Sequence, residues 1–147
     1  MSSQNHISAP KVFVVGLSEE ETSQLAARHA VAMAEATGAT VHFVTAVERD
    51  EVSVIPMGSD EFVFDTIESA RVAGERFVES LGTDVSFTVE AMDGSPAKAL
   101  LEVAERVGAD LIVVGNVRMQ GVGRVLGSVG NDVLRNAPCS VLIVKTV

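Results

Sequence analysis

The sequence has no tryptophan and no tyrosine, and it has a single cysteine. One cysteine cannot form an intramolecular disulfide, and it cannot supply a metal site built from several cysteines. Without tryptophan or tyrosine, recognition by stacking on those rings is excluded as well. Basic residues are few, because 11 lysines and arginines stand against 20 aspartates and glutamates, for a net charge of −9. They form no basic cluster, so we expect no nucleic-acid partner.

Long hydrophobic runs are missing too. No apolar stretch approaches the roughly 18 residues of a membrane-spanning helix, so no membrane association is expected. The first ten residues are polar and contain no signal-peptide core, which predicts a flexible tail over residues 1–10 and a cytoplasmic protein. Hydrophobic residues make up 47% of the chain and are spread along it, which favours one folded domain over residues 11–147.

Hydrophobic periodicity predicts strands that alternate with helices. Short apolar runs rich in β-branched residues indicate strands over residues 11–15, 41–47, 85–91, 111–114 and 139–146. Helices are expected from a cap at Ser18 to Gly38 and over residues 62–81, 96–107 and 128–136. This alternation predicts an α/β fold: an open five-stranded parallel sheet of order 3-2-1-4-5 with helices on both faces, the flavodoxin-like three-layer sandwich.

Two of the expected helices begin with capping signals. Ser18 and Glu21 have the spacing of a capping box, and Ser95-Pro96 joins a cap residue to a proline at the first helical position. The first helix also has a set of residues at helical spacing along one face, which are Leu25, His29, Ala32 and Ala36.

Two of the strands differ in pattern, which predicts their places in the sheet. Residues 85–91 alternate apolar and polar side chains, as expected of a half-exposed edge strand. The run from Leu111 to Val114 is the most apolar strand, so it is expected at the sheet centre.

The predicted topology indicates where a ligand would bind. Open α/β sheets bind ligands beyond the carboxyl ends of the strands where strand order reverses, here between the first and fourth strands. The loops at that point are Gly16–Ser18 and Gly115–Ser128. The second loop is rich in glycine, whose backbone N–H groups can approach an anion, and a helix N-terminus follows it, so a phosphate-bearing ligand is expected. The alternative is that these glycines only allow a long loop to turn. The glycines of this second loop are Gly115, Gly121, Gly123 and Gly127, and the only cationic residues in the loop are Arg118 and Arg124.

Other functions of open sheets fit the sequence less well. A complete phosphate-binding P-loop is absent, and the run from Glu19 to Glu21 would repel the phosphate of a flavin. No nucleophile, base and orienting acid cluster in sequence near the switch point, so we predict no catalytic residues and no metal ligands. At most, we expect the protein to hydrolyse a nucleotide slowly. Cys139 is interpreted as a buried small hydrophobe rather than a reactive thiol.

Several segments resemble the universal stress protein family. They are Leu111–Asn116 (Leu-Ile-Val-Val-Gly-Asn), Gly127-Ser128-Val129 and the run from Ala137-Pro138 to Val144, with Gly94-Ser95-Pro96 and Gly108-Ala-Asp110 in support. The resemblance covers residues 10 to 147, and the family's fold is the one predicted above. Some members of the family bind ATP or a related adenine nucleotide, and others do not.

The nucleotide-binding members have a G-x2-G-x9-G-[ST] pattern after the fourth strand and an aspartate after the first. Here Gly127-Ser128 matches, but Arg118 stands at the second glycine, the loop is one residue shorter, and Gly16 stands where the aspartate would be. The resemblance thus implies binding of ATP, AMP or cyclic AMP, with Mg²⁺ only if ATP binds. Arg118 would contact a phosphate or block the ATP pose. The implied nucleotide-binding residues are Gly16, Leu17, Ser18, Ala46, Val114, Gly115, Arg118, Gly121, Gly127, Ser128 and Val129. The alternative is a dimeric stress protein that binds no nucleotide and acts through contacts with an unknown protein partner.

The last strand is apolar and is expected at a sheet edge, where unpaired backbone groups favour association. A homodimer formed by pairing this strand with its own copy is expected, and the resemblance implies the same. The alternative is an edge protected by Lys145 and the chain terminus. The expected interface residues are Val141, Leu142, Ile143, Val144, Lys145 and Thr146.

Overall fold

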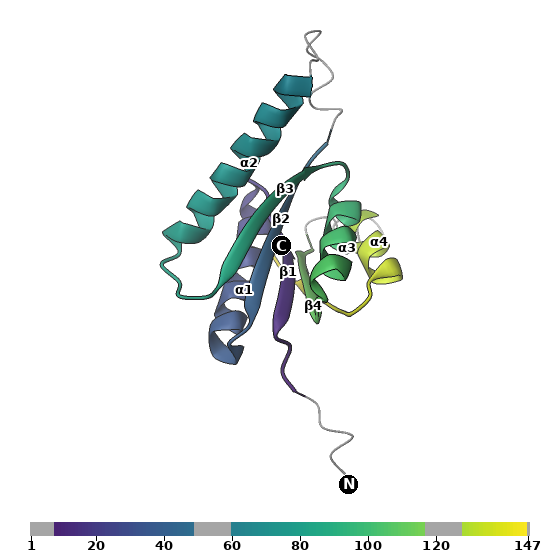
Figure 1. The fold of residues 1–147 in the computed structure, drawn as a ribbon. Helices are drawn as coiled ribbons and strands as arrows, with labels where there is room; N and C mark the ends of the chain where they lie inside the picture. The colour runs from purple at the N-terminus through teal and green to yellow at the C-terminus, as the bar shows by residue number, and fades with distance from the viewer. Residues whose placement is uncertain (1–7, 49–59, 117–127, 147) are drawn as a thin grey trace.

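The computed structural model describes residues 8–48, 60–116 and 128–146, which form an α/β sandwich (Figure 1). Within these ranges the chain alternates strands and helices as the sequence predicts. In chain order the elements are β1 (Val12–Gly16), α1 (Glu21–Thr37), β2 (Thr40–Val47), α2 (Asp60–Ser80), β3 (Phe87–Asp93), α3 (Pro96–Val107), β4 (Leu111–Gly115), α4 (Ser128–Asn136) and β5 (Ser140–Val144). No helix in the described part of the chain is long and apolar enough to span a membrane.

All five strands are parallel, in the order β3-β2-β1-β4-β5, which confirms the predicted topology. β3 lies at one edge, as its alternating pattern indicated. β4 lies inside the sheet between β1 and β5, and β1 holds the middle position, both as the predicted order requires. Both strands are buried on both faces, so hydrophobicity alone could not rank them. β5 occupies the other edge and is shorter than the predicted strand over residues 139–146.

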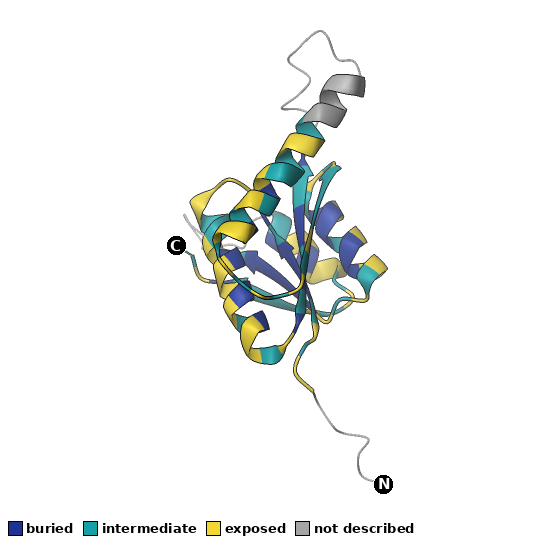
Figure 2. Cartoon of the chain, turned by 60° about the vertical axis from the view of Figure 1, so that its left-hand side comes forward, coloured by how far each residue is buried: buried dark blue, intermediate teal, exposed yellow. Residues whose placement is uncertain are grey.

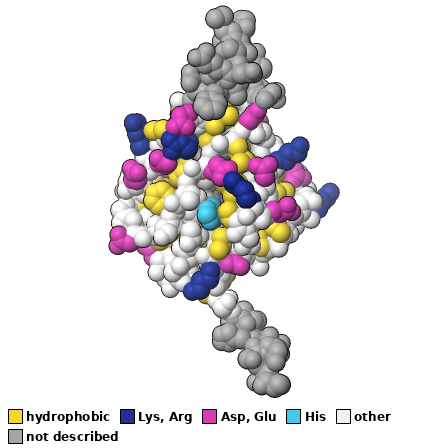
Figure 3. Space-filling view, viewed as in Figure 1, with side chains coloured by type: hydrophobic (Ala, Val, Ile, Leu, Met, Phe, Trp, Pro, Cys, Tyr) yellow, Lys and Arg dark blue, Asp and Glu magenta, His cyan; other side chains and the backbone are white. Residues whose placement is uncertain are grey.

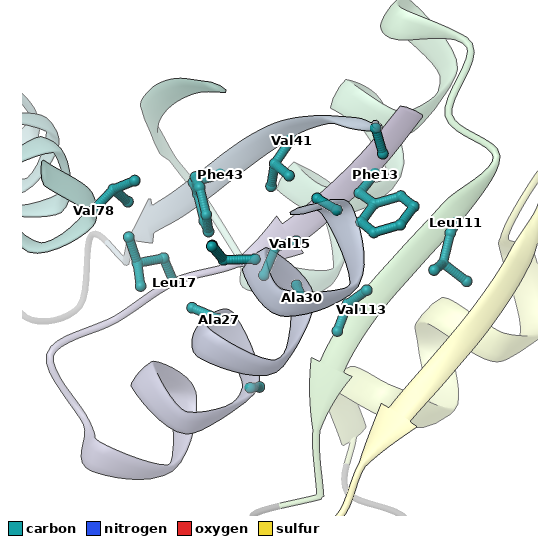
Figure 4. Packing of buried hydrophobic residues seen from close by; sticks show 14 of the residues in the cluster. Phe13, Val15, Leu17, Ala27, Ala30, Val41, Phe43, Val78, Leu111 and Val113 are labelled. Atoms are coloured by element: carbon teal, nitrogen blue, oxygen red, sulfur yellow. The ribbon is translucent and has the colours of Figure 1, made fainter. Parts of the chain in front are cut away.

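Helices cover both faces of the sheet. α1 and α2 pack on one face and α3 and α4 on the other, and each face has its own hydrophobic cluster. Figure 4 shows the cluster under α1 and α2, where Phe43 lies toward Val78 of α2 and Phe13 lies toward Leu111 of β4. Buried residues lie along the strands and the inner sides of the helices, and the outer sides are exposed (Figure 2).

The face of α1 that packs on the sheet differs from the face singled out in the sequence. Its buried side chains are those of Ala26, Ala27, Ala30, Val31 and Ala34. Leu25, His29, Ala32 and Ala36 lie on the exposed side instead, and Leu25 is 39% exposed. Alanines of α1 occur on all sides of the helix, so the spacing of apolar residues does not distinguish its buried side from its exposed side. The small side chains on the inner side allow the helix to approach the sheet closely.

The start of α1 also differs from the prediction. The helix begins at Glu21 with Glu20 as its N-cap, and no side chain caps it, so the capping box of Ser18 and Glu21 does not form. Ser18 Oγ accepts a hydrogen bond from the Glu20 N–H (3.3 Å), and Ser23 Oγ accepts one from the Ser18 N–H (2.8 Å). These bonds hold the residues after β1 in a turn that competes with an earlier helix start.

The other capping prediction is confirmed, because Ser95 Oγ accepts a hydrogen bond from the Lys98 N–H at the start of α3 (3.4 Å).

On the opposite face of the sheet from α3, α2 approaches the sheet closely at Gly74. A Cβ at this position would lie 2.9 Å from Val89 Cγ1 and 3.4 Å from Leu17 Cδ2. Only glycine allows the helix backbone to approach these side chains so closely.

Candidate functional site

The carboxyl ends of β1 and β4 lie next to each other, as the predicted switch point requires. The two strands pair in parallel, with Val15 opposite Val113, so Gly16 and Gly115 leave the sheet at the same edge. From there β1 leads into α1, while β4 leads toward residues 117–127. The described part of the site therefore consists of the turn after β1, the ends of β2 and β4, and the start of α4.

Four of the predicted site residues lie in one layer, on the side covered by α3 and α4. Val114 belongs to the buried cluster on this side, and Ala46 and Val129 pack against it. A Cβ at Gly16 would lie 3.6 Å from both methyl groups of Leu100, which belongs to the same cluster. Leu100 of α3 thus lies beneath the site, although sequence reasoning missed it.

Leu17 is placed differently from these four residues. Its side chain is 6% exposed and packs in the opposite cluster, under α1 and α2. Its N–H donates to the Val44 carbonyl (2.9 Å), and its carbonyl accepts from Thr45 Oγ1 (3.0 Å). The Ser18 N–H donates to Ser23 Oγ. The backbone amides of Leu17 and Ser18 are therefore engaged within the protein.

At the end of β4, three segments meet. A Cβ at Gly115 would lie 3.4 Å from Thr146 Oγ1 and 3.5 Å from the Thr22 carbonyl of α1. Asn116 Oδ1 accepts hydrogen bonds from the Thr146 N–H (2.7 Å) and from Thr146 Oγ1 (3.0 Å). The C-terminal residues thus lie against the end of the strand that carries two predicted site residues.

The glycine-rich segment of the predicted site falls largely outside the described residues. This applies to Arg118, Gly121 and Gly127, and also to Gly123 and Arg124. α4 begins at Ser128, so the N-terminus of a nine-residue helix directly follows this segment. An α-helix N-terminus favours anions because its first N–H groups lack partners within the helix.

Charge near the turn after β1 is negative. Glu19, Glu20 and Glu21 are all exposed there. Within the described residues, no group of three or more histidine, cysteine, aspartate or glutamate side chains is arranged to hold a metal ion. The face seen in Figure 3 mixes acidic and basic side chains, with hydrophobic ones between them.

Among the described residues, Cys139 and His42 have shifted pKa values, and neither lies at the carboxyl ends of β1 and β4. Burial raises the pKa of the Cys139 thiol, and nearby Asp110 raises it further, which disfavours the reactive thiolate. Burial also lowers the pKa of His42, as does Arg106, while Glu90 opposes them. His42 Nδ1 lies 2.8 Å from Thr88 Oγ1, near the amino end of the β2–β3 pairing.

β5 is an edge strand, paired with β4 along one side. Val141, Leu142 and Ile143 are partly buried by the helices on the two faces, and Val144 is buried. Lys145 is exposed and Thr146 is partly buried. The strand thus has the edge position that the predicted dimer requires.

Comparisons with known proteins agree on one family. A family model described as the universal stress protein family matches residues 10–145. The universal stress protein MJ0531 of Methanocaldococcus jannaschii is 32% identical over 139 residues, which cover 92% of this chain and 82% of that protein. The universal stress protein Rv1636 of Mycobacterium tuberculosis is 40% identical over 87 residues, which cover 58% of this chain and 53% of that protein.

Solved structures are similar in fold. A universal stress protein crystallised in complex with cAMP has a TM-score of 0.71 at 31% identity, covering 95% of this chain and 100% of that chain. The protein MJ0577 has a TM-score of 0.72 at 25% identity, covering 92% of this chain and 95% of that chain. A universal stress protein of Archaeoglobus fulgidus in complex with dAMP has a TM-score of 0.65 at 18% identity, covering 92% and 98% of the two chains, and is similar in fold.

Proposed function

The chain belongs to the universal stress protein family, and on that basis we propose that it is a stress-response or signalling module that binds an adenine nucleotide between the ends of β1 and β4. The convergence of Gly16, Ala46 and Val114 in one layer above Leu100 is the observation that carries the proposal. The similar structure with 31% identity was crystallised with cAMP, which supports an adenine nucleotide as the ligand.

The two halves of the proposed site have different tasks. The apolar layer formed by Ala46, Val114 and Val129 takes the base and ribose, with the Ala46 backbone available for hydrogen bonds. The phosphate goes to the glycine-rich segment and the start of α4, because the Leu17 and Ser18 amides are already engaged. Arg118 would contact the phosphate or obstruct a longer one.

The charge around the site favours a nucleotide with few phosphates. The exposed carboxylates from Glu19 to Glu21 lie at the turn after β1 and repel anions. Cyclic AMP carries one negative charge, whereas ATP carries several and is repelled more strongly. We therefore propose that cyclic AMP or AMP binds more tightly than ATP, and that Mg²⁺ takes part only when ATP binds.

A second candidate function is a module that binds no nucleotide and acts through protein contacts. Gly16 and Arg118 favour it, because they stand where nucleotide-binding members of the family have aspartate and glycine. In either case we propose a homodimer formed by pairing of the β5 edges. Its support is the edge position of β5 and the partly exposed apolar residues along it.

Isothermal titration calorimetry with cyclic AMP, AMP and ATP tests the proposed binding. We expect cyclic AMP and AMP to bind more tightly than ATP, and Gly127→Val to abolish binding by filling the space where backbone would meet phosphate. Ala73→Val, on the exposed side of α2, is the control and should bind as the unmodified protein does. Absence of binding by all three nucleotides would overturn the proposal. Unchanged affinity in Gly127→Val would exclude this site.

A further inference from the structure

The Asn116 side chain joins two parts of the chain that are 30 residues apart. Its Oδ1 accepts the Thr146 N–H at 2.7 Å and the Thr146 hydroxyl at 3.0 Å. Asn116 is the first residue after β4, and Thr146 is the second residue after β5. One side-chain oxygen thus connects the end of the nucleotide-site strand to the end of the edge strand.

This contact continues the β4–β5 pairing past the last residue pair. Strand pairing ends at Gly115 opposite Val144. Beyond that pair, the Thr146 N–H meets the Asn116 side-chain oxygen, where a paired strand would offer a backbone carbonyl. The Asn116 backbone can therefore leave the sheet while the C-terminal residues stay bonded to its side chain.

The contact between Asn116 and Thr146 is closely packed on Gly115. A Cβ at Gly115 would lie 3.4 Å from Thr146 Oγ1 and 3.5 Å from Thr146 Cγ2, so Thr146 lies directly over this glycine. The Thr22 carbonyl of α1 also lies 3.5 Å from this Cβ position. A displacement of Gly115 and Asn116 would therefore have to move the C-terminal residues or the first turn of α1.

We propose that Asn116 is a positioning residue, which couples nucleotide binding at Gly115 to the C-terminal end of β5 through Thr146. The inference rests on the proposed function, because it assumes that a nucleotide lies against the end of β4. Coupling between two sites is reciprocal in free energy. If the bonds to Thr146 favour the arrangement that binds nucleotide, then bound nucleotide stabilises those bonds by the same factor.

Two measurements test the coupling: the affinity for cyclic AMP, and the hydrogen exchange rate of the Thr146 amide. Thr146→Val removes only the hydroxyl bond and keeps the side-chain shape, so it should weaken cyclic AMP binding by about 2- to 12-fold, as expected for one neutral hydrogen bond. Thr146→Ser keeps the hydroxyl and should bind almost as the unmodified protein does. Asn116→Leu removes the acceptor of both bonds and should weaken binding further.

In the unmodified protein, saturating cyclic AMP should slow exchange of the Thr146 amide by a factor similar to the affinity lost in Asn116→Leu. If cyclic AMP binds but Thr146→Val keeps full affinity and Thr146 exchange stays unchanged, the coupling is refuted while the proposed function stands. If the unmodified protein binds no adenine nucleotide, both proposals fall. Thr146→Val and Thr146→Ser each change one group of the threonine side chain at a partly buried position, so these two variants decide the question even if Asn116→Leu does not fold.

Discussion

Gly16→Asp is the substitution that examines the proposed site most directly. It places a carboxylate where the nucleotide-binding members of the family have one. The new Cβ would lie 3.6 Å from Leu100 Cδ1 and Cδ2, which is ordinary van der Waals contact, so the position has room for a side chain. Gly16 is partly exposed at the end of β1, which leaves the carboxylate access to water. We therefore expect the variant to fold.

The expected gain in affinity follows from two opposing effects. A hydrogen bond from a ribose hydroxyl or a base amino group to the new carboxylate contributes about 1.5–3 kcal/mol. A single phosphate charge about 8 Å away in water reduces this by about 0.5 kcal/mol. The net effect on cyclic AMP is about 5- to 70-fold tighter binding. ATP should gain much less, because each further phosphate charge adds repulsion.

Calorimetric titration of three proteins measures this effect. The matched control is Gly16→Ala, which adds the same Cβ without the carboxylate. It should leave the affinity unchanged and raise the free energy of unfolding by about 0.4–1 kcal/mol, because alanine restricts the unfolded chain. A folded Gly16→Asp protein that binds cyclic AMP no more tightly than Gly16→Ala would refute the placement of the nucleoside beside Gly16.

Two further predictions concern the glycine-rich segment and the edge strand. If Arg118 contacts a phosphate, Arg118→Ala should weaken nucleotide binding by about 1.5–3 kcal/mol. If Arg118 instead obstructs ATP, Arg118→Gly should strengthen ATP binding. Calorimetry of both variants separates the two cases, and unchanged affinity in both would show that Arg118 has no part in binding. Ile143→Pro removes a backbone donor from β5, so light scattering at micromolar concentration should report a monomer. A dimer that persists in this variant would contradict the β5 interface. An unmodified protein that is already monomeric would contradict it as well.

Much of the fold could be predicted from the sequence because its signals are local. The apolar run of β4, the serine and proline before α3, and the alternation along β3 each indicate their element within a few residues. The exposed side of α1 could not be predicted from spacing, because alanines occur around the whole helix. Its start at Glu21 depends on the bond from the Ser18 N–H to Ser23, which competes with the expected cap.

The position of the candidate site was also predictable, since it follows from strand order alone. Its composition was less so, because it depends on contacts between distant segments. Leu100 lies under Gly16 only because α3 crosses that part of the sheet. The Leu17 amide is engaged because β2 provides the Val44 carbonyl, and the Asn116–Thr146 contact spans 30 residues. No local pattern marks these pairs.

For protein engineering, the close approach of α2 at Gly74 has a practical consequence. Replacing a helical glycine with alanine is a common way to raise thermal stability, because alanine favours the helix by about 1 kcal/mol. At this position the added methyl would lie 2.9 Å from Val89 Cγ1, on an edge strand, and 3.4 Å from Leu17 in the turn beside the proposed ligand. Overpacking of this kind costs about 1–3 kcal/mol, which exceeds or cancels the gain. A stabilisation programme for this domain should therefore keep Gly74 and place its alanines on exposed helix positions.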